Sequence, residues 1–176
     1  MADISKAFEI TLGSEGGYSN NPNDAGGETM FGITIAVARE NGYTGSMKAM
    51  PLSVAKSIYK KKYWDTLELD KLTNQKIANL AFDIAVNAGV GTASKMLQET
   101  VNFMTYDNIL VDGDIGKTSV ARLNTIDTPK ETELAVLLIS TLQGEHYLKC
   151  MRNREKNEEF ALGWLRRMRK NMNQAN

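Results

Sequence analysis

Helical periodicity runs through most of this 176-residue chain and constrains its fold more than any other feature. Apolar residues recur three or four positions apart in one segment after another, and only three prolines interrupt them. This spacing, with the Gly and Pro breaks, predicts helices near residues 4–12, 35–41, 51–63, 74–88, 92–104, 117–123, 130–141 and 158–170. In the helix that begins near residue 130, the expected core-facing stripe is Leu134, Leu137, Leu138 and Thr141. The predicted fold is therefore mainly α.

One segment lacks this periodicity. Between residues 18 and 34 no helical stripe is present, and "NPNDAGG" at 21–27 concentrates residues that favour turns. Its flanks, "GYSN" at 17–20 and "TMFGIT" at 29–34, are expected to pair as a short β-hairpin with its turn near residues 24–27. The sequence thus predicts a helical domain with a small β-hairpin after the first helix.

Composition argues against several classes of function. The 21 basic and 21 acidic residues give zero net charge, which disfavours nucleic acid as a partner. One Cys and one His are too few for an internal disulfide or an ordinary zinc site. "DGDIG" at 112–116 lacks the distal ligands of a calcium loop and predicts a tight turn. The polar N-terminus and the short apolar runs lead us to expect no signal peptide, no stable membrane insertion and no metal or other cofactor.

Two carboxylates flank the non-helical segment. Glu15 follows the first predicted helix, where the negative end of the helix dipole gives a carboxylate no stabilisation, and the hairpin would bring Asp24 back beside it. Glycoside hydrolysis needs such a pair, because one carboxyl group must be protonated and the other ionised. Burial and a helix C-terminus suit Glu15 as the acid, a polar turn suits an ionised Asp24, and Thr29 could hold a water. Taken alone, however, acid–Gly-Gly segments are common in ordinary loops.

The segment "EGGYSNNPNDAGGETMFGIT" at 15–34 resembles the signature of the glycoside hydrolase 108 family of N-acetylmuramidases, peptidoglycan-cleaving enzymes of phages and bacteria. The resemblance continues through "IYKKKYWDTLELDKL", "FDIAVNAGVGTASKMLQ" and "VDGDIGKTS". It extends to "FALGWLRRM", which is similar to the family's C-terminal predicted peptidoglycan-binding region. It implies a lysozyme-like helical domain, with a catalytic region at 1–90 and a helical peptidoglycan-binding region at 91–176 packed in the same globular unit.

The same resemblance implies which residues form the site. Glu15 matches the family's catalytic acid, and Asp24 and Thr29 match positions that echo the Glu–Asp–Thr triad of phage-type lysozymes. Thr29 arrives one residue early for that wider pattern, which leaves its role open. Aromatic residues at helical spacing also suit a core, which we expect for Tyr59, and an Asn at a helix end can act as a cap. The residues expected to contact substrate are Tyr18, Asn20, Tyr63, Trp64 and Asn87.

The expected function is hydrolysis of the β-1,4 bond between N-acetylmuramic acid and N-acetylglucosamine in peptidoglycan glycan strands, by a monomer. A phage or prophage endolysin made in the host cytoplasm would reach the cell wall or periplasm through a holin or another release route. Two alternatives are a lytic transglycosylase, which needs a Glu but no second carboxylate, and a noncatalytic wall-binding module. The last helix carries basic residues that either form a solvated face or attract anionic peptidoglycan: Arg166, Arg167, Arg169 and Lys170.

Overall fold

The computed structural model describes residues 1–13, 17–20, 27–106, 108–153 and 158–175. Within them the α-helices are α1 (Ile4–Thr11), α2 (Ile35–Glu40), α3 (Leu52–Tyr59), α4 (Gln75–Ala88), α5 (Val90–Thr105), α6 (Lys117–Leu123), α7 (Pro129–Asn153) and α8 (Glu158–Ala175). The strands are β1 (Thr29–Met30) and β2 (Ile33–Thr34). Shorter pieces are 3-10 helices at Met47–Ala49 and Leu69–Lys71 and a π-helical turn at Lys60–Trp64. The mainly helical fold with a small hairpin after α1 is confirmed.

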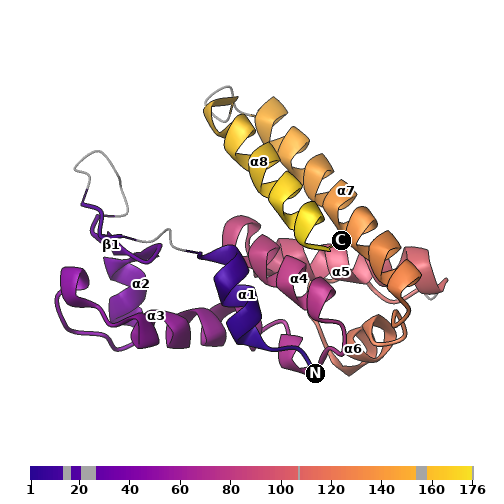
Figure 1. Ribbon diagram of the computed structural model, residues 1–176, viewed down its shortest axis with the longest axis horizontal. Coiled ribbons are helices and arrows are strands. Elements are labelled where there is room, and N and C mark those ends of the chain that lie inside the picture. The colour runs from indigo at the N-terminus through magenta and orange to yellow at the C-terminus, as the bar shows by residue number, and fades with distance from the viewer. Residues whose placement is uncertain (14–16, 21–26, 107, 154–157, 176) are drawn as a thin grey trace.

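Helix α4 lies at the centre of the arrangement (Figure 1). It packs against α1, α5 and α7, and α5 also packs against α7. Helix α8 runs back along α7, so that its C-terminal end returns to α4. The hairpin, α2 and α3 lie on the opposite side of α1 from the α7–α8 pair (Figure 1). The end of the chain therefore contacts elements that belong to its first half.

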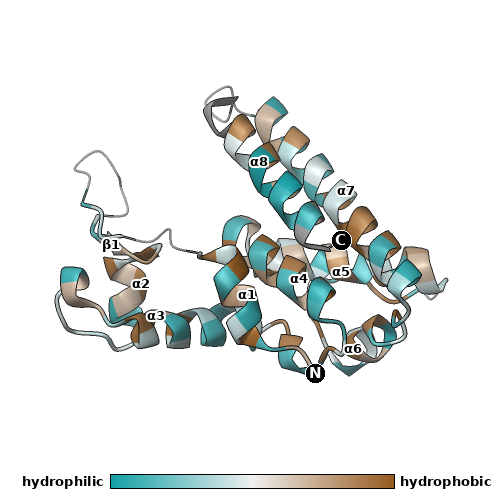
Figure 2. Cartoon of the chain, in the orientation of Figure 1, coloured by the Kyte–Doolittle hydropathy of each residue, from teal (hydrophilic) through white to brown (hydrophobic). Residues whose placement is uncertain are grey.

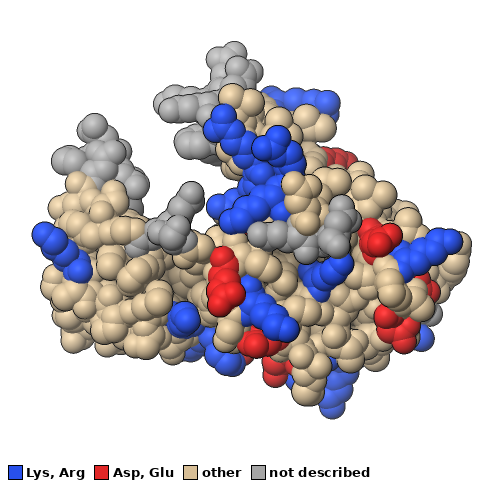
Figure 3. All heavy atoms as spheres, in the orientation of Figure 1, with Lys and Arg blue, Asp and Glu red and all other residues tan. Residues whose placement is uncertain are grey.

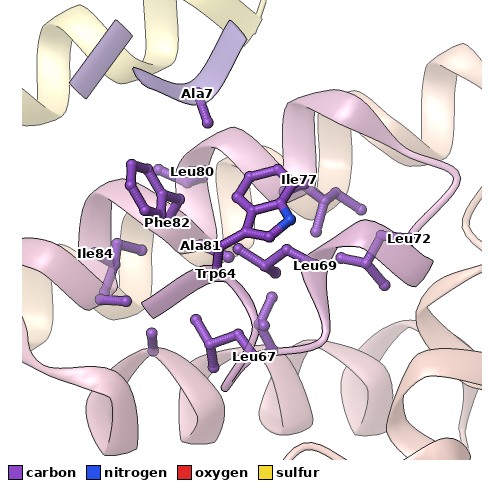
Figure 4. Close-up of a cluster of buried hydrophobic side chains, with 14 of the residues drawn as sticks. Ala7, Trp64, Leu67, Leu69, Leu72, Ile77, Leu80, Ala81, Phe82 and Ile84 are labelled. Carbon is purple, nitrogen blue, oxygen red and sulfur yellow. The ribbon is translucent and has the colours of Figure 1, made fainter. Parts of the chain in front are cut away.

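The core is built around Phe82, which is fully buried on α4. Its ring meets those of Phe8 on α1, Tyr59 on α3 and Trp64 edge-on or nearly so, at centroid distances of 5.4, 6.4 and 5.8 Å. Figure 4 shows Trp64 and Phe82 side by side, with leucines of the segment after the π-helical turn beneath them. Aromatic contacts of this geometry stabilise a core beyond the area that they bury. Phe82 thus joins α4 to α1 and to the continuous segment of α3 and the π-helical turn.

The hairpin has its tight turn at Phe31 and Gly32. Strands β1 and β2 are antiparallel, with Thr29 opposite Thr34, and both turn residues have positive φ, 51° and 74°. Two consecutive positive φ values are what a two-residue turn between twisted strands requires. The predicted pairing of 17–20 with 29–34 is present as a backbone bridge between Ser19 and Thr29. The turn at residues 31–32 was not predicted, and residues 24–26 of the expected turn lie outside the described residues.

The core-facing stripe predicted for α7 is wrong. Leu134 and Leu137 are 49% and 52% exposed, and Thr141 is also exposed. The buried face of α7 consists of Thr132, Ala135, Val136, Ile139, Ser140, Gln143 and Tyr147. Several of these side chains are small or polar, which lets α7 approach α4 and α5 closely. The leucines Leu134 and Leu137 therefore do not mark the buried face of this helix.

Helices α7 and α8 pack through a small residue and an aromatic pair. At Gly144, a Cβ atom would lie 3.1 Å from Cε of Met168, so the absence of a side chain there brings the helices together. The rings of Tyr147 and Trp164 are stacked, with centroids 5.0 Å apart and planes 13° apart. Trp164 and Met168 thus face α7. The second half of α8 is otherwise hydrophilic and is largely teal in Figure 2.

We expect Phe82→Ala to lower the free energy of unfolding by about 3–5 kcal/mol, because it leaves a cavity among the rings of α1, α3 and the π-helical turn. Phe103→Ala is the matched control, since Phe103 is a largely exposed phenylalanine on α5. Its effect should stay within about 0.5 kcal/mol. Urea denaturation followed by circular dichroism measures both, and equal shifts of the two variants would contradict the central place of Phe82.

Candidate active-site cleft

A cleft of about 280 Å³ opens where α1 ends, and five parts of the chain meet at it. They are the end of α1, the hairpin turn, the α3 helix with its π-helical extension, the end of α4, and α8. The lining residues are Thr11, Leu12, Phe31, Gly32, Tyr59, Tyr63, Val86, Asn87 and Arg167. Figure 3 shows a hollow between the hairpin side and α8, with Lys and Arg side chains gathered on the α8 side. Among the described lining residues Arg167 carries the one charge, and it is positive.

The hairpin wall of the cleft is held by Tyr59. Its hydroxyl donates a hydrogen bond to the backbone oxygen of Phe31 at 3.0 Å. Burial raises the pKa of Tyr59 from 10.0 to about 12, so the hydroxyl stays an uncharged donor at neutral pH. Because this pKa is raised in the folded protein, its contribution to stability is complete below pH 10 and is lost as the pH rises toward 12. Gly32 makes the contact sterically feasible, since a Cβ there would lie 2.8 Å from the Tyr59 hydroxyl.

The aromatic wall continues with Tyr63, one turn after Tyr59. The two rings lie 5.6 Å apart, and Tyr63 is half-buried, with burial raising its pKa. Tyr63 therefore lies in the cleft, where the sequence placed it. The prediction that Trp64 contacts substrate is corrected by its position, because Trp64 is 1% exposed and packs on Phe82 in the core. Adjacent residues of one helical turn thus face in different directions, one into the cleft and one into the core.

The end of α4 contributes Asn87 and, one turn earlier, Asp83. The Asn87 side chain donates to the backbone oxygen of Asp83 at 2.6 Å and also lines the cleft. The Asp83 carboxylate is 3% exposed and accepts hydrogen bonds from Arg167 at 2.9 Å and from Asn171 at 2.7 Å. A carboxylate buried this deeply needs such partners to remain charged. The signal for it in the sequence is an Asp inside the apolar run "IANLAFDIAV".

The basic residues of α8 do not form one face. Arg167 faces α4, and Lys170 donates from Nζ to the backbone oxygen of Ile10 at 2.9 Å, close to the end of α1. That bond satisfies one of the carbonyl groups that a helix C-terminus leaves free. Arg166 and Arg169 are exposed. The two interpretations, a solvated face and a substrate-facing one, therefore apply to different residues of α8.

The comparisons with known proteins divide the chain in two. Residues 8–89 match the family described as Glycosyl hydrolase 108, and residues 92–169 match the one described as Predicted Peptidoglycan domain. Residues 8–89 form a domain of the glycosyl hydrolase 108 family. Its fold is similar to a solved structure described as "Structure of Brucella abortus SagA", with a TM-score of 0.71 and 26% identity over 98% of this chain and 92% of that one. No curated protein matches. The enzyme is a glycoside hydrolase that acts on peptidoglycan, which places its action at the cell wall.

The other residues that the sequence predicted for the site of this hydrolase either do not line the cleft or lie outside the described residues. Glu15 and Asp24 lie outside the described residues. Thr29 is on β1 and its hydroxyl donates to the backbone oxygen of Gly27 at 3.4 Å. Tyr18 is exposed, with the Lys48 ammonium 6.0 Å from its ring centroid, and Asn20 is exposed too. The catalytic roles of Glu15, Asp24 and Thr29 and the substrate contacts of Tyr18 and Asn20 stay predictions.

The remaining features concern parts of this hydrolase outside the cleft. A larger cavity of about 430 Å³ lies between the first turns of α4 and α7, but Asn74 and Thr132 in its wall bond to each other at 2.6 Å. The "DGDIG" segment forms the tight turn that the sequence predicted, with Asp112 accepting from the backbone of Asp114. Across the described ranges, no group of three or more Asp, Glu, His or Cys side chains is placed to hold a metal ion. No described helix is long and apolar enough to cross a membrane.

We expect Gly32→Ala to lower both stability and peptidoglycan hydrolysis, because the new Cβ would push Tyr59 away from the hairpin. Gly42→Ala is the matched control. Gly42 also has a positive φ, 84°, but nothing lies within 4 Å of the new Cβ. Both variants should lose about 1–2 kcal/mol from backbone strain, and Gly32→Ala about 1 kcal/mol more with the displaced hydrogen bond.

A Tyr59→Phe background tests the cause. Removing the hydroxyl removes the atom that the Gly32→Ala side chain would meet. In that background Gly32→Ala should therefore cost no more stability than Gly42→Ala does, as measured by thermal unfolding. An undiminished extra loss would show that the contact between Tyr59 and the hairpin does not explain the need for glycine.

Proposed function

We propose that this enzyme hydrolyses the β-1,4 bond between N-acetylmuramic acid and N-acetylglucosamine, with Glu15 as general acid and Asp24 as general base. The observation that carries the proposal is the position of the cleft at the end of α1. Leu12 lines the cleft, and Glu15 follows it by three residues. Covalent geometry keeps the two Cα atoms within about 11 Å. Glu15 therefore belongs to a chain segment that starts at the cleft wall.

The hairpin supports the same proposal from the other side. Its turn forms part of the cleft wall and is fixed there by Tyr59. Asp24 precedes Gly27, the residue whose backbone oxygen accepts from the Thr29 hydroxyl, by three positions. The segment that carries Asp24 thus leads into β1, the strand that precedes the cleft-lining turn. Thr29 assists by positioning water or the loop, and its one-residue displacement from the wider pattern suits an assisting role.

The chemistry requires the two carboxyl groups to differ in protonation. The negative end of a helix and a partly closed cleft favour a protonated acid, whereas the backbone N–H groups of a polar turn favour an ionised base. A spacing of roughly 6.5–9.5 Å between them would leave room for the attacking water and would invert the anomeric centre. Asp24 is the feature that favours hydrolysis over a transglycosylase reaction.

The substrate contacts that we propose are those of a glycan groove. Tyr63 presents a half-buried ring to the cleft, and an aromatic face suits a pyranose ring. The side-chain nitrogen of Asn87 donates a hydrogen bond to a backbone oxygen within α4. Its amide oxygen can then accept a hydrogen bond from the acetamide N–H of a sugar. Tyr18 and Asn20 would extend the groove along the segment between the two carboxylates. We further propose a monomer in which regions 1–90 and 91–176 act as one unit, released to the wall by a holin or a similar route.

Glu15→Gln tests the catalytic acid. The substitution keeps the size of the side chain but removes its proton, so peptidoglycan lysis should fall by roughly 10²–10⁴-fold. Glu9→Gln is the matched control, because Glu9 is an exposed glutamate on α1. Turbidity of purified peptidoglycan measures activity, and circular dichroism checks folding. A folded Glu15→Gln enzyme as active as the control would refute the assignment.

Product analysis tests Asp24 and the type of reaction. Hydrolysis leaves muramic acid with a reducing end to which water has been added, and mass spectrometry of the released muropeptides detects it. Asp24→Asn should slow the formation of these products, since an amide cannot act as the base. Products with 1,6-anhydro ends would mean that the enzyme is a transglycosylase and that Asp24 has another role.

A further inference from the structure

The cleft of this hydrolase obtains a charged wall from the C-terminal half of the chain. Arg167 lies on α8, within the region that matches the Predicted Peptidoglycan domain, yet it lines the same cleft as the end of α1 and the hairpin turn. Three contacts hold α8 there: Arg167 and Asn171 to Asp83, and Lys170 to the Ile10 carbonyl oxygen. The C-terminal half is therefore part of the cleft itself.

We propose that Arg167 is a specificity-determining residue that binds a carboxylate of the substrate, on the muramoyl lactyl group or on the stem peptide. This inference rests on the proposed muramidase function and extends it. Its subject is how the enzyme recognises muramic acid rather than how the bond is broken. A neutral β-1,4-linked N-acetylglucosamine polymer lacks these carboxylates, so such a contact would select peptidoglycan.

The hydrogen bonds around Asp83 leave most of the guanidinium available. Among the described residues, Arg167 donates to Asp83 through Nη1 alone, and Asn171 serves the other carboxylate oxygen. A guanidinium carries five N–H groups, so four remain. The Arg167 side chain is 33% exposed and lines the cleft. The buried Asp83 thus fixes one edge of the guanidinium and orients the rest.

The charges around the cleft favour an anionic ligand. No acidic side chain is among its described lining residues, and Arg166 is exposed nearby on the same helix. Figure 3 shows this concentration of basic side chains beside the hollow. Guanidinium and carboxylate form charge-assisted hydrogen bonds, which are stronger than bonds between neutral groups. In peptidoglycan the lactyl carboxyl is either free or joined to a stem peptide, and the peptide brings carboxylates of its own.

Three soluble substrates that share one glycan backbone test the inference. The first is a native glycan strand with stem peptides, the second is the same strand with its carboxylates amidated, and the third has had its stem peptides removed, which leaves free lactyl carboxylates. The measurement is kcat/KM from the release of reducing ends. We expect Arg167→Gln to lower kcat/KM on the native strand by about 10- to 100-fold, the effect of losing a hydrogen bond between charged groups. On the amidated strand it should match the parent enzyme within about twofold.

The third substrate identifies the source of the carboxylate. A loss of activity confined to strands that carry stem peptides assigns Arg167 to the carboxylates of the peptide. A loss on strands without stem peptides assigns it to the lactyl carboxylate, because this carboxyl is free only there and is an amide in the native strand. Both results support the inference. An equal loss on all three substrates would overturn it, because Arg167 would then act on the fold or on the catalytic acid. If the alkaline limb of the pH–rate profile shifts in Arg167→Gln, the lost contact is one that sets the pKa of the catalytic acid.

The double variant Asp83→Asn/Arg167→Gln keeps the test interpretable if Arg167→Gln folds poorly. It removes both charges of the buried pair, so no uncompensated carboxylate stays inside the protein. We expect it to fold and to keep the selective loss on strands that carry free carboxylates, and parent-like activity both on the native strand and on the strand without stem peptides would overturn the inference. Arg169→Gln is the matched control, since it removes an exposed α8 charge outside the cleft lining.

The failure of this inference can be separated from that of the proposed function. A parent enzyme that releases no muramic acid reducing ends from any strand refutes the muramidase proposal and the role of Arg167 with it. A parent that releases them, with an Arg167→Gln variant that is parent-like both on the native strand and on the strand without stem peptides, refutes the role of Arg167 alone.

Discussion

The buried carboxylate of Asp83 is the constraint on which the rest of the structure depends. It lies on α4, next to Phe82 at the centre of the aromatic core, and almost no water reaches it. A charge in such a place is tolerated only where partners supply both opposite charge and hydrogen bonds. Arg167 and Asn171 supply them, and both come from α8. The need to satisfy one carboxylate therefore holds the last helix against the middle of the chain.

This placement of α8 unites the two matched regions in one cleft. The glycosyl hydrolase region provides the end of α1, the hairpin turn and the end of α4, and the predicted peptidoglycan region provides Arg167. Lys170 adds a bond to a carbonyl oxygen at the end of α1. A helix that closes the cleft in this way couples substrate recognition to the fold, because the same guanidinium that neutralises Asp83 faces the cleft.

Close approach of backbone elements shapes the other walls. Gly32 lets the hairpin turn sit on the Tyr59 hydroxyl, and Gly144 lets α7 and α8 meet at Met168. At each of these positions a side chain would separate elements that hydrogen bonds or rings hold together. The stacking of Tyr147 on Trp164 then extends the α7–α8 contact. The cleft is thus positioned by small residues as much as by large apolar ones.

The sequence by itself determined the helices and the segment that interrupts them, because helical spacing, Gly and Pro act over a few residues. It also identified the family, since the motif around residues 15–34 is local. Of the residues that it predicted to contact substrate, Tyr63 and Asn87 line the cleft. It misjudged α7 and Trp64, because spacing shows which residues share a face but not which neighbour covers that face. Only the tertiary structure decided that Asp83 is buried and paired with Arg167, since a separation of 84 positions along the chain does not determine whether they meet.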